Sequence, residues 1–211
     1  MRYLALDKLA AVDAADFARR KPFPWLGMAD LVTPEGYAAL LANMPGLDLF
    51  EQKVGYRRRA GQAPHDRYSL EFTPDTPVPA PWRAFIDELC NSGYREQIAR
   101  LFRCGRPTFR FHWHYTPTGC SVSPHCDARR EYGSQLFYFN PEGDWLPEWG
   151  GGTLILDDAG RLNYDSAPAL EEFVAIQEAP FIGNQSTLFQ RTDHCWHAVQ
   201  PITCPEGRLR R

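Results

Sequence analysis

The second half of the chain is a series of short segments with β-forming composition, and this series limits the fold more than any other feature. After residue 104, segments rich in aromatic and β-branched residues alternate with clusters of Gly, Pro, Asn and Asp. The segments read TFRFHWHY, SQLFYFN, GGTLIL, FVAIQE, QSTLFQR, HAVQPIT and GRLRR. Many short strands with turns between them predict two sheets packed face to face, as in a jelly roll, which is also called a double-stranded β-helix.

The first half predicts helices and two further strands. The segment DKLAAVDAADFARR has apolar residues at helical spacing, and TPEGYAALLANMP begins with Thr33 as an N-cap and Pro34 at the first helical position. A third helix, PAPWRAFIDELCNSGYREQIARLF, has a possible break at residues 91–93, whereas DLFEQK and RYSLEF alternate like strands. We therefore predict a mainly β protein of one domain over residues 1–211. Residues 1–104 would supply helical support and the first strands, and residues 105–211 the jelly-roll core.

Composition and charge exclude several classes of protein. The formal net charge of −3 shows no basic footprint for nucleic acid. No segment approaches the ~18 apolar residues of a membrane span, and Asp7, Asp13 and Asp16 interrupt the region where a signal peptide needs an apolar run. We expect a cytoplasmic protein with no nucleic-acid or membrane partner. The chain stops at Arg211 inside its last predicted strand, so we also expect that the natural C-terminus lies further on.

A His-x-Asp motif, His125-Cys126-Asp127, is the strongest candidate for a metal site. A non-haem iron centre needs two imidazoles and one carboxylate on one face of the metal. Side chains two residues apart at the end of a strand point the same way, so His125 and Asp127 meet this need. His194 and His197 are the candidates for a third ligand. We favour His197, because it opens an apolar strand. The alternative is a structural turn, since a lone His-x-Asp is common.

Two further features agree with a buried site. The glycine-rich entry WGGGTLIL is of the kind that lets another segment approach the backbone closely. Arg208 and Arg210 would share one face of the final strand, so either side chain can point inward. A buried guanidinium needs an acidic partner, and its fork shape suits a carboxylate.

From about Phe109 onward the chain resembles the Fe(II)- and 2-oxoglutarate-dependent oxygenases, in the branch similar to prolyl hydroxylases. The resemblance rests on the order and spacing of several elements. They are Tyr115 ten positions before His125, His125-Cys126-Asp127, FYFN with Tyr138, Trp145 with Gly151-Gly152, HAVQP with His197, and a late arginine.

This resemblance implies the cofactors and the roles of the residues. It implies that His125, Asp127 and His197 hold Fe(II). It also implies that 2-oxoglutarate is the co-substrate and that Arg208 or Arg210 binds the far carboxylate of 2-oxoglutarate. Tyr138 and Tyr115 would line the co-substrate pocket, together with apolar residues such as Leu136 and Leu154. The implied activity is hydroxylation of an unactivated carbon, in a prolyl or amino-acid-like group of a protein side chain or a small molecule. Related halogenases carry a small residue at this position. The presence of Asp127 in this chain therefore favours hydroxylation.

Three other interpretations remain open. His112 and His114 form a His-x-His pair, as in a cupin-like metal enzyme that does not use 2-oxoglutarate. A non-catalytic jelly-roll binding module is also compatible with the pattern. The third concerns two arginine-rich segments. Arg129 and Arg130 would bind a polar or anionic substrate, and the loop YRRRAG at residues 56–61 would form a lid. The alternative is that both segments are solvated loops.

Overall fold

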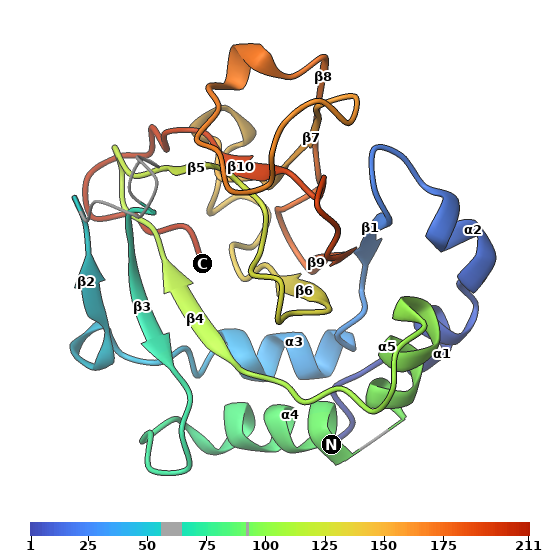
Figure 1. Cartoon of the computed structure of the whole chain (residues 1–211). Helices are drawn as coiled ribbons and strands as arrows, with labels where there is room; N and C mark the ends of the chain where they lie inside the picture. Colours follow the sequence, from blue (N-terminus) through green and yellow to red (C-terminus); the bar gives the residue numbers. More distant parts are fainter. Residues whose placement is uncertain (56–64, 92) are drawn as a thin grey trace.

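The computed structural model describes residues 1–55, 65–91 and 93–211, and its helices come from the first half of the chain (Figure 1). Thr33 caps its helix as predicted, because its hydroxyl accepts a hydrogen bond from the Gly36 amide. The first predicted helix is divided in two, since the Asp13 carboxylate accepts from the Asp16 amide and starts a new helix. The helices are α1 (Leu6–Ala10), α2 (Ala14–Arg19), α3 (Pro34–Leu41), α4 (Ala80–Asn91) and α5 (Tyr94–Phe102).

The strands form three antiparallel sheets, with the orders β1-β9-β6, β5-β10-β7-β8 and β2-β3-β4. The protein is therefore mainly β with a few helices, as predicted. The strands are β1 (Trp25–Ala29), β2 (Glu51–Lys53), β3 (Arg67–Glu71), β4 (His112–Tyr115), β5 (Val122–His125), β6 (Gly133–Phe137), β7 (Leu154–Asp157), β8 (Ala175–Glu178), β9 (Gln185–Gln190) and β10 (His197–Val199). Short 3-10 turns occur at Leu47–Leu49, Pro147–Trp149 and Leu170–Glu172.

Strands from the first half of the chain pair with strands from the second half. β1 pairs along its whole length with β9, from Trp25 opposite Phe189 to Ala29 opposite Gln185. β3 pairs with β4 in the same way, with Ser69 opposite His114. The N-terminal half is thus part of the sheets as well as their helical support.

The prediction of a final strand over the segment GRLRR is wrong. Between residues 205 and 208 the chain makes a turn in which the Arg208 amide donates to the Pro205 carbonyl, and Gly207 takes a φ of 82°. Only the last residues pair with another segment, through a bridge of Arg210 to Thr116 and a hydrogen bond from the Phe139 amide to the Arg211 carbonyl. The chain therefore ends between the end of β4 and the segment after β6.

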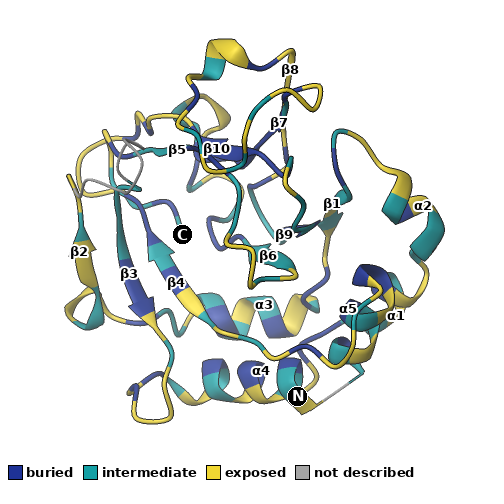
Figure 2. Ribbon diagram, viewed as in Figure 1, coloured by how far each residue is buried: buried dark blue, intermediate teal, exposed yellow. Residues whose placement is uncertain are grey.

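The helices cover one side of the sheets with apolar side chains. Trp82 and Phe85 of α4 contact Trp113 of β4 and Phe137 of β6, with ring centroids 5.3 Å and 5.4 Å apart. Figure 2 shows that the buried positions of α4 and α5 face the interior, while their outer faces are exposed. This packing fixes β3, β4 and β6 relative to one another. In the part of the chain that the structure describes, no helix is long and apolar enough to cross a bilayer.

Candidate metal centre and co-substrate pocket

The three predicted metal ligands meet at the junction of β5 and β10. β5 ends at His125 and β10 begins at His197, and the antiparallel register places these two residues directly opposite each other. Their ring centroids are 4.1 Å apart. The Oδ1 atom of Asp127 lies 3.9 Å from Nε2 of His125 and 3.6 Å from Nε2 of His197. One ligand atom from each residue lies within 4.8 Å of the others, a group that fits a metal ion.

Backbone carbonyls orient both imidazoles toward this group. The Nδ1 atom of His125 lies 2.9 Å from the Ser123 carbonyl, and Nδ1 of His197 lies 2.9 Å from the Cys195 carbonyl. A carbonyl only accepts hydrogen bonds, so each Nδ1 carries the proton and each Nε2 presents a lone pair. This tautomer is the one that binds a metal through Nε2.

A serine from the neighbouring sheet orients the carboxylate. Ser134, on β6, donates from its hydroxyl to Oδ2 of Asp127 at 2.7 Å. The other oxygen, Oδ1, is left facing the two histidines. Two nitrogens and one oxygen therefore converge from one side, which matches the two-histidine, one-carboxylate arrangement of non-haem iron sites.

We expect Ser134→Ala to weaken metal binding by about 10- to 100-fold, because the loss of a hydrogen bond behind a ligand has effects of that size. Titration of the apoprotein with Mn(II), followed by calorimetry, measures this change directly. Ser186→Ala is the control, since Ser186 lies on β9 of the same sheet and donates instead to the Met28 carbonyl. Equal affinities for Ser134→Ala and the wild type would remove Ser134 from the site.

A cavity of about 680 Å³ extends from these ligands into the interior. Arg210 reaches it as a buried side chain whose guanidinium lies 5.0 Å over the Tyr138 ring. Its Nε and Nη2 atoms are buried, and neither has a hydrogen-bond partner among the described residues. Burial lowers the pKa of Arg210 from its usual value. A buried cation with two unused donors is costly unless a ligand supplies an acceptor.

Gly151 explains how Arg210 reaches the cavity. A Cβ atom at Gly151 would lie 2.9 Å from Cγ of Arg210, and the Gly151 φ of 102° is one that other residues rarely adopt. The glycine-rich segment WGGGTLIL therefore leaves the space through which the arginine passes, in agreement with the close approach expected from its sequence.

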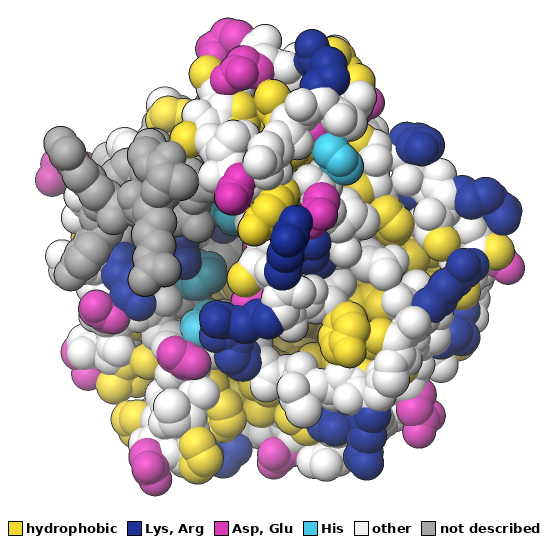
Figure 3. All heavy atoms as spheres, viewed as in Figure 1, with side chains coloured by type: hydrophobic (Ala, Val, Ile, Leu, Met, Phe, Trp, Pro, Cys, Tyr) yellow, Lys and Arg dark blue, Asp and Glu magenta, His cyan; other side chains and the backbone are white. Residues whose placement is uncertain are grey.

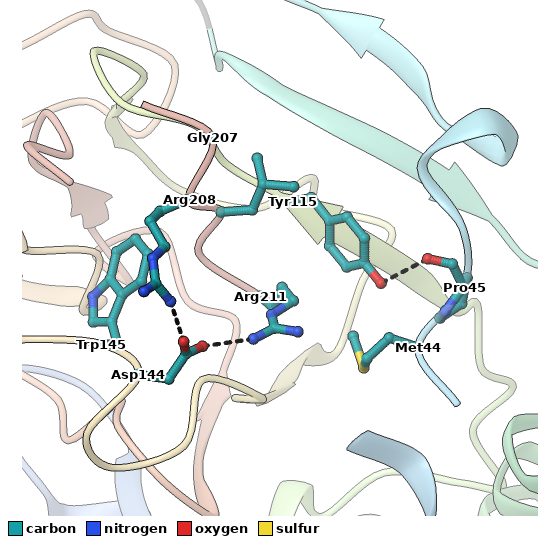
Figure 4. A pocket seen from close by; sticks show the side chains of 9 residues that line it. Met44, Pro45, Tyr115, Asp144, Trp145, Gly207, Arg208 and Arg211 are labelled. Atoms are coloured by element: carbon teal, nitrogen blue, oxygen red, sulfur yellow. Dashed lines mark hydrogen bonds and ion pairs between the residues drawn. The ribbon is translucent and has the colours of Figure 1, made fainter. Parts of the chain in front are cut away.

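Arg208 lies in a different place, so the two candidate arginines are separated by the structure. The Arg208 side chain is half exposed and pairs with Asp144, which also binds Arg211 at 2.9 Å. Figure 4 shows this pair in a second cavity, of about 340 Å³, beside Trp145. The prediction that Arg208 and Arg210 share one face of a final strand is wrong, because the turn at Gly207 replaces the strand.

The two predicted tyrosines both line the large cavity, but their hydroxyl groups have different partners. The hydroxyl of Tyr138 lies 2.8 Å from Oγ1 of Thr153, in the cavity below Arg210. The hydroxyl of Tyr115 instead donates to the Pro45 carbonyl at 3.0 Å, as Figure 4 shows, and its ring stacks on Phe50. Burial raises the pKa of Tyr115. Tyr138 therefore lies beside Arg210, where a co-substrate contact is expected, whereas Tyr115 lines the same cavity but directs its hydroxyl to Pro45 and so joins β4 to the segment after α3.

Other predicted residues divide between the cavity and its surroundings. Leu136 and Arg130 line the cavity. Arg129 does not, because it binds Asp193 at 3.2 Å and lies 4.0 Å over the Tyr164 ring. The predicted pocket residue Leu154 packs instead in a separate apolar cluster with Leu156, Phe173 and Trp196. The predicted lid, at residues 56–61, lies outside the described residues.

The cupin-like alternative has little support in the geometry. Within the described ranges, the metal-ligand group contains His125, Asp127 and His197, and neither His112 nor His114 belongs to a group of three. Both line the cavity from β4, with ring centroids 6.0 Å apart. They are wall residues of the pocket in this structure.

Sequence reasoning missed several pocket residues. Ser134, Gln135, His65 and Arg67 all line the cavity, and the His65 ring lies 4.1 Å from the His125 ring. Ser134 lies seven residues after Asp127, at the start of a predicted strand, so its place beside the motif was a usable signal. His65 and Arg67 had none, because they reach the site through a bridge of His65 to Val122 on β5.

Solved structures of other proteins have the same fold as this chain. The structure is similar to a Pseudomonas putida prolyl-4-hydroxylase, with 19% identity, a TM-score of 0.62, and coverage of 96% of this chain and 94% of that one. The chain has the prolyl-hydroxylase fold. A Trichoplax adhaerens prolyl hydroxylase, in complex with a hypoxia inducible factor oxygen degradation domain peptide fragment, aligns with a TM-score of 0.63, 14% identity, and coverage of 97% and 86%. No protein-family model and no curated protein matches the sequence. The resemblance predicted from the motifs is confirmed at the level of fold.

Proposed function

We propose that this protein is an Fe(II)- and 2-oxoglutarate-dependent dioxygenase that hydroxylates an unactivated carbon, built as one domain around a double-stranded β-helix. The observation that carries the proposal is one cavity with two complementary features. It holds the His125, Asp127 and His197 group, and it holds the buried guanidinium of Arg210 with unused donors. A ferrous ion bound there would supply oxygen activation coupled to the decarboxylation of 2-oxoglutarate.

The residues present fit a ferrous ion. His125 and His197 offer neutral nitrogens whose direction is set by carbonyls, and Asp127 offers one oxygen whose direction is set by Ser134. Three ligands on one side leave the remaining positions open, as oxygen-activating sites require. These three residues bind the metal in our proposal.

The residues also fit 2-oxoglutarate, which has a carboxylate at each end. One carboxylate would satisfy the unpartnered donors of Arg210, in a charge-assisted and two-pronged contact. Tyr138 lies under the guanidinium and is itself held by the Thr153 hydroxyl. Together these side chains orient the co-substrate, while Leu136 and Phe189 form apolar wall of the cavity and exclude water.

The test is succinate formation. Purified protein supplied with Fe(II), 2-oxoglutarate and air is expected to form succinate slowly without any added substrate, and the rate should fall to background when the metal is chelated. Chromatography of the reaction mixture measures both compounds. Absence of succinate from a protein that calorimetry shows to bind metal and 2-oxoglutarate would reject the proposal.

The substrate class follows by analogy with the fold. The two similar structures named above are prolyl hydroxylases, and one was solved with a peptide. We therefore propose a prolyl or amino-acid-like group as the site of hydroxylation. In this proposal Arg130, which lines the cavity, contacts that substrate, and Arg129, which binds Asp193, does not.

A further inference from the structure

Strands β3 and β4 contribute one wall of the cavity, and one face of this wall carries Arg67, His112 and His114 together with Glu71, which lies outside the cavity lining. The register places Ser69 opposite His114 and Glu71 opposite His112, so Arg67, two residues before Ser69, lies on the same face as both histidines. Arg67, His112 and His114 all line the cavity. Arg210 joins this wall through its bridge to Thr116, the residue that follows β4.

The cavity as a whole has more cations than anions. Its described lining includes five arginines (Arg67, Arg110, Arg130, Arg210 and Arg211) and two carboxylates (Asp127 and Glu131). Asp127 belongs to the metal group, and Glu131 binds Arg110 at 2.7 Å. Figure 3 shows histidine and Lys or Arg side chains gathered around a hollow on this face of the molecule. This excess favours an anionic ligand beyond the metal site.

His114 adds a neutral hydrogen-bonding group to the same wall. Burial and the neighbouring cations Arg67, His112, Arg210 and Lys53 hold the pKa of His114 well below its usual value. Its imidazole is therefore uncharged at neutral pH. No hydrogen bond joins its ring to any of the residues that the structure describes, so its one N–H group can donate to a ligand in the cavity.

Arg67 also lies near the reacting centre. It is two residues from His65, and side chains at this spacing on an extended chain point the same way. The His65 ring lies 4.1 Å from the ring of the metal ligand His125. An anion on Arg67 would thus hold a molecule whose other end reaches the metal.

We propose that Arg67 and His114 bind a carboxylate of the primary substrate. The inference rests on the proposed function, in which Arg210 binds one carboxylate of 2-oxoglutarate and leaves this separate cationic position for the substrate. The substrate is then an amino-acid-like molecule with a free carboxylate, either a free amino acid or the C-terminal residue of a peptide. An internal residue of a neutral peptide has no such group.

The experiment compares acids with their amides. Succinate formation above the substrate-free rate is measured with the proteinogenic L-amino acids, with their α-carboxamides, and with Gly-Pro and Ala-Pro as free acids and as amides. We expect at least one acid to stimulate turnover and its amide to fail. Stimulation by the single amino acids or only by the dipeptides tells the two sources apart.

Variants then locate the carboxylate. Arg67→Gln is expected to raise the KM for the stimulating acid by about tenfold or more, as loss of a charge-assisted hydrogen bond implies. Lys53→Gln is the matched control, because Lys53 is the cross-strand partner of Arg67 but pairs with Glu51 and lies outside the cavity lining. His114→Phe is a second variant, which keeps the test decisive if Arg67→Gln folds poorly. It is also expected to raise the KM for the stimulating acid.

Three results would overturn the inference. They are equal stimulation by acid and amide, no stimulation by any acid, and an unchanged KM in both Arg67→Gln and His114→Phe. Substrate-free succinate formation by the wild-type protein tests the proposed function separately, so the failure of one is distinguishable from the failure of the other.

Discussion

Replacing Asp127 with alanine is expected to abolish 2-oxoglutarate turnover and to lower the affinity for divalent metal by more than ~100-fold. Loss of a hydrogen-bonding group behind a ligand weakens metal binding by about 10- to 100-fold, and loss of the ligand itself should weaken it further. The variant leaves His125 and His197 with no carboxylate to complete the group. Calorimetric titration with Mn(II) measures the affinity, and the succinate assay measures turnover.

The Asp127→Ala protein should still fold. The Asp127 side chain is about 15% exposed, so water can reach the Ser134 hydroxyl that loses its acceptor. Asp193→Ala is the control, because Asp193 lies close by and binds Arg191 at 2.6 Å and Arg129 at 3.2 Å, outside the metal group. Full turnover by Asp127→Ala would show that Asp127 is not a ligand. Loss of turnover in both variants would show that the site tolerates no change in this region.

The metal group was predictable because its signals are local. Two ligands lie two residues apart, a spacing at which side chains of extended backbone point the same way, and the third opens an apolar strand. The structure adds the register that sets His197 opposite His125. It also adds the carbonyls that fix both tautomers, which no residue pattern encodes because any residue supplies a carbonyl.

The part of the pocket wall that β3 contributes was not predictable, because it depends on how distant segments meet. Arg67 reaches the cavity through the pairing of β3 with β4 and the bridge of His65 to Val122. The choice between Arg208 and Arg210 depends on a turn at Gly207 that the strand-like composition of GRLRR conceals. β5 was also missed as a separate strand, since Pro124 lies inside it and weakens the strand signal.

Replacing Arg210 with methionine is expected to have two opposite effects. The apparent KM for 2-oxoglutarate should rise by roughly 10- to 100-fold, because a two-pronged contact worth about 1.5–3 kcal/mol is lost. In the absence of 2-oxoglutarate, however, the variant should be more stable than the wild type. Nε and Nη2 of Arg210 are buried without partners among the described residues, and methionine fills similar space with no polar group to desolvate.

The size of the stabilisation follows from competing terms. An unsatisfied buried donor costs about 1–3 kcal/mol, while the contact of the guanidinium with the Tyr138 ring returns part of that cost. A net gain of about 1 kcal/mol in unfolding free energy corresponds to a Tm higher by about 2–4 °C in a chain of this size. Thermal unfolding followed by circular dichroism, with and without 2-oxoglutarate, measures it. The ligand should raise the Tm of the wild type and leave that of Arg210→Met nearly unchanged.

Arg208→Met is the matched control for this prediction. Arg208 is half exposed and pairs with Asp144 in the second cavity, so its loss should change neither the KM for 2-oxoglutarate nor the shift in Tm that the ligand causes. A rise in KM confined to Arg208→Met would move the co-substrate to the cavity beside Trp145. An unchanged KM in both variants would remove 2-oxoglutarate from the proposed function, since a buried guanidinium with two open donors is the feature that assigns it.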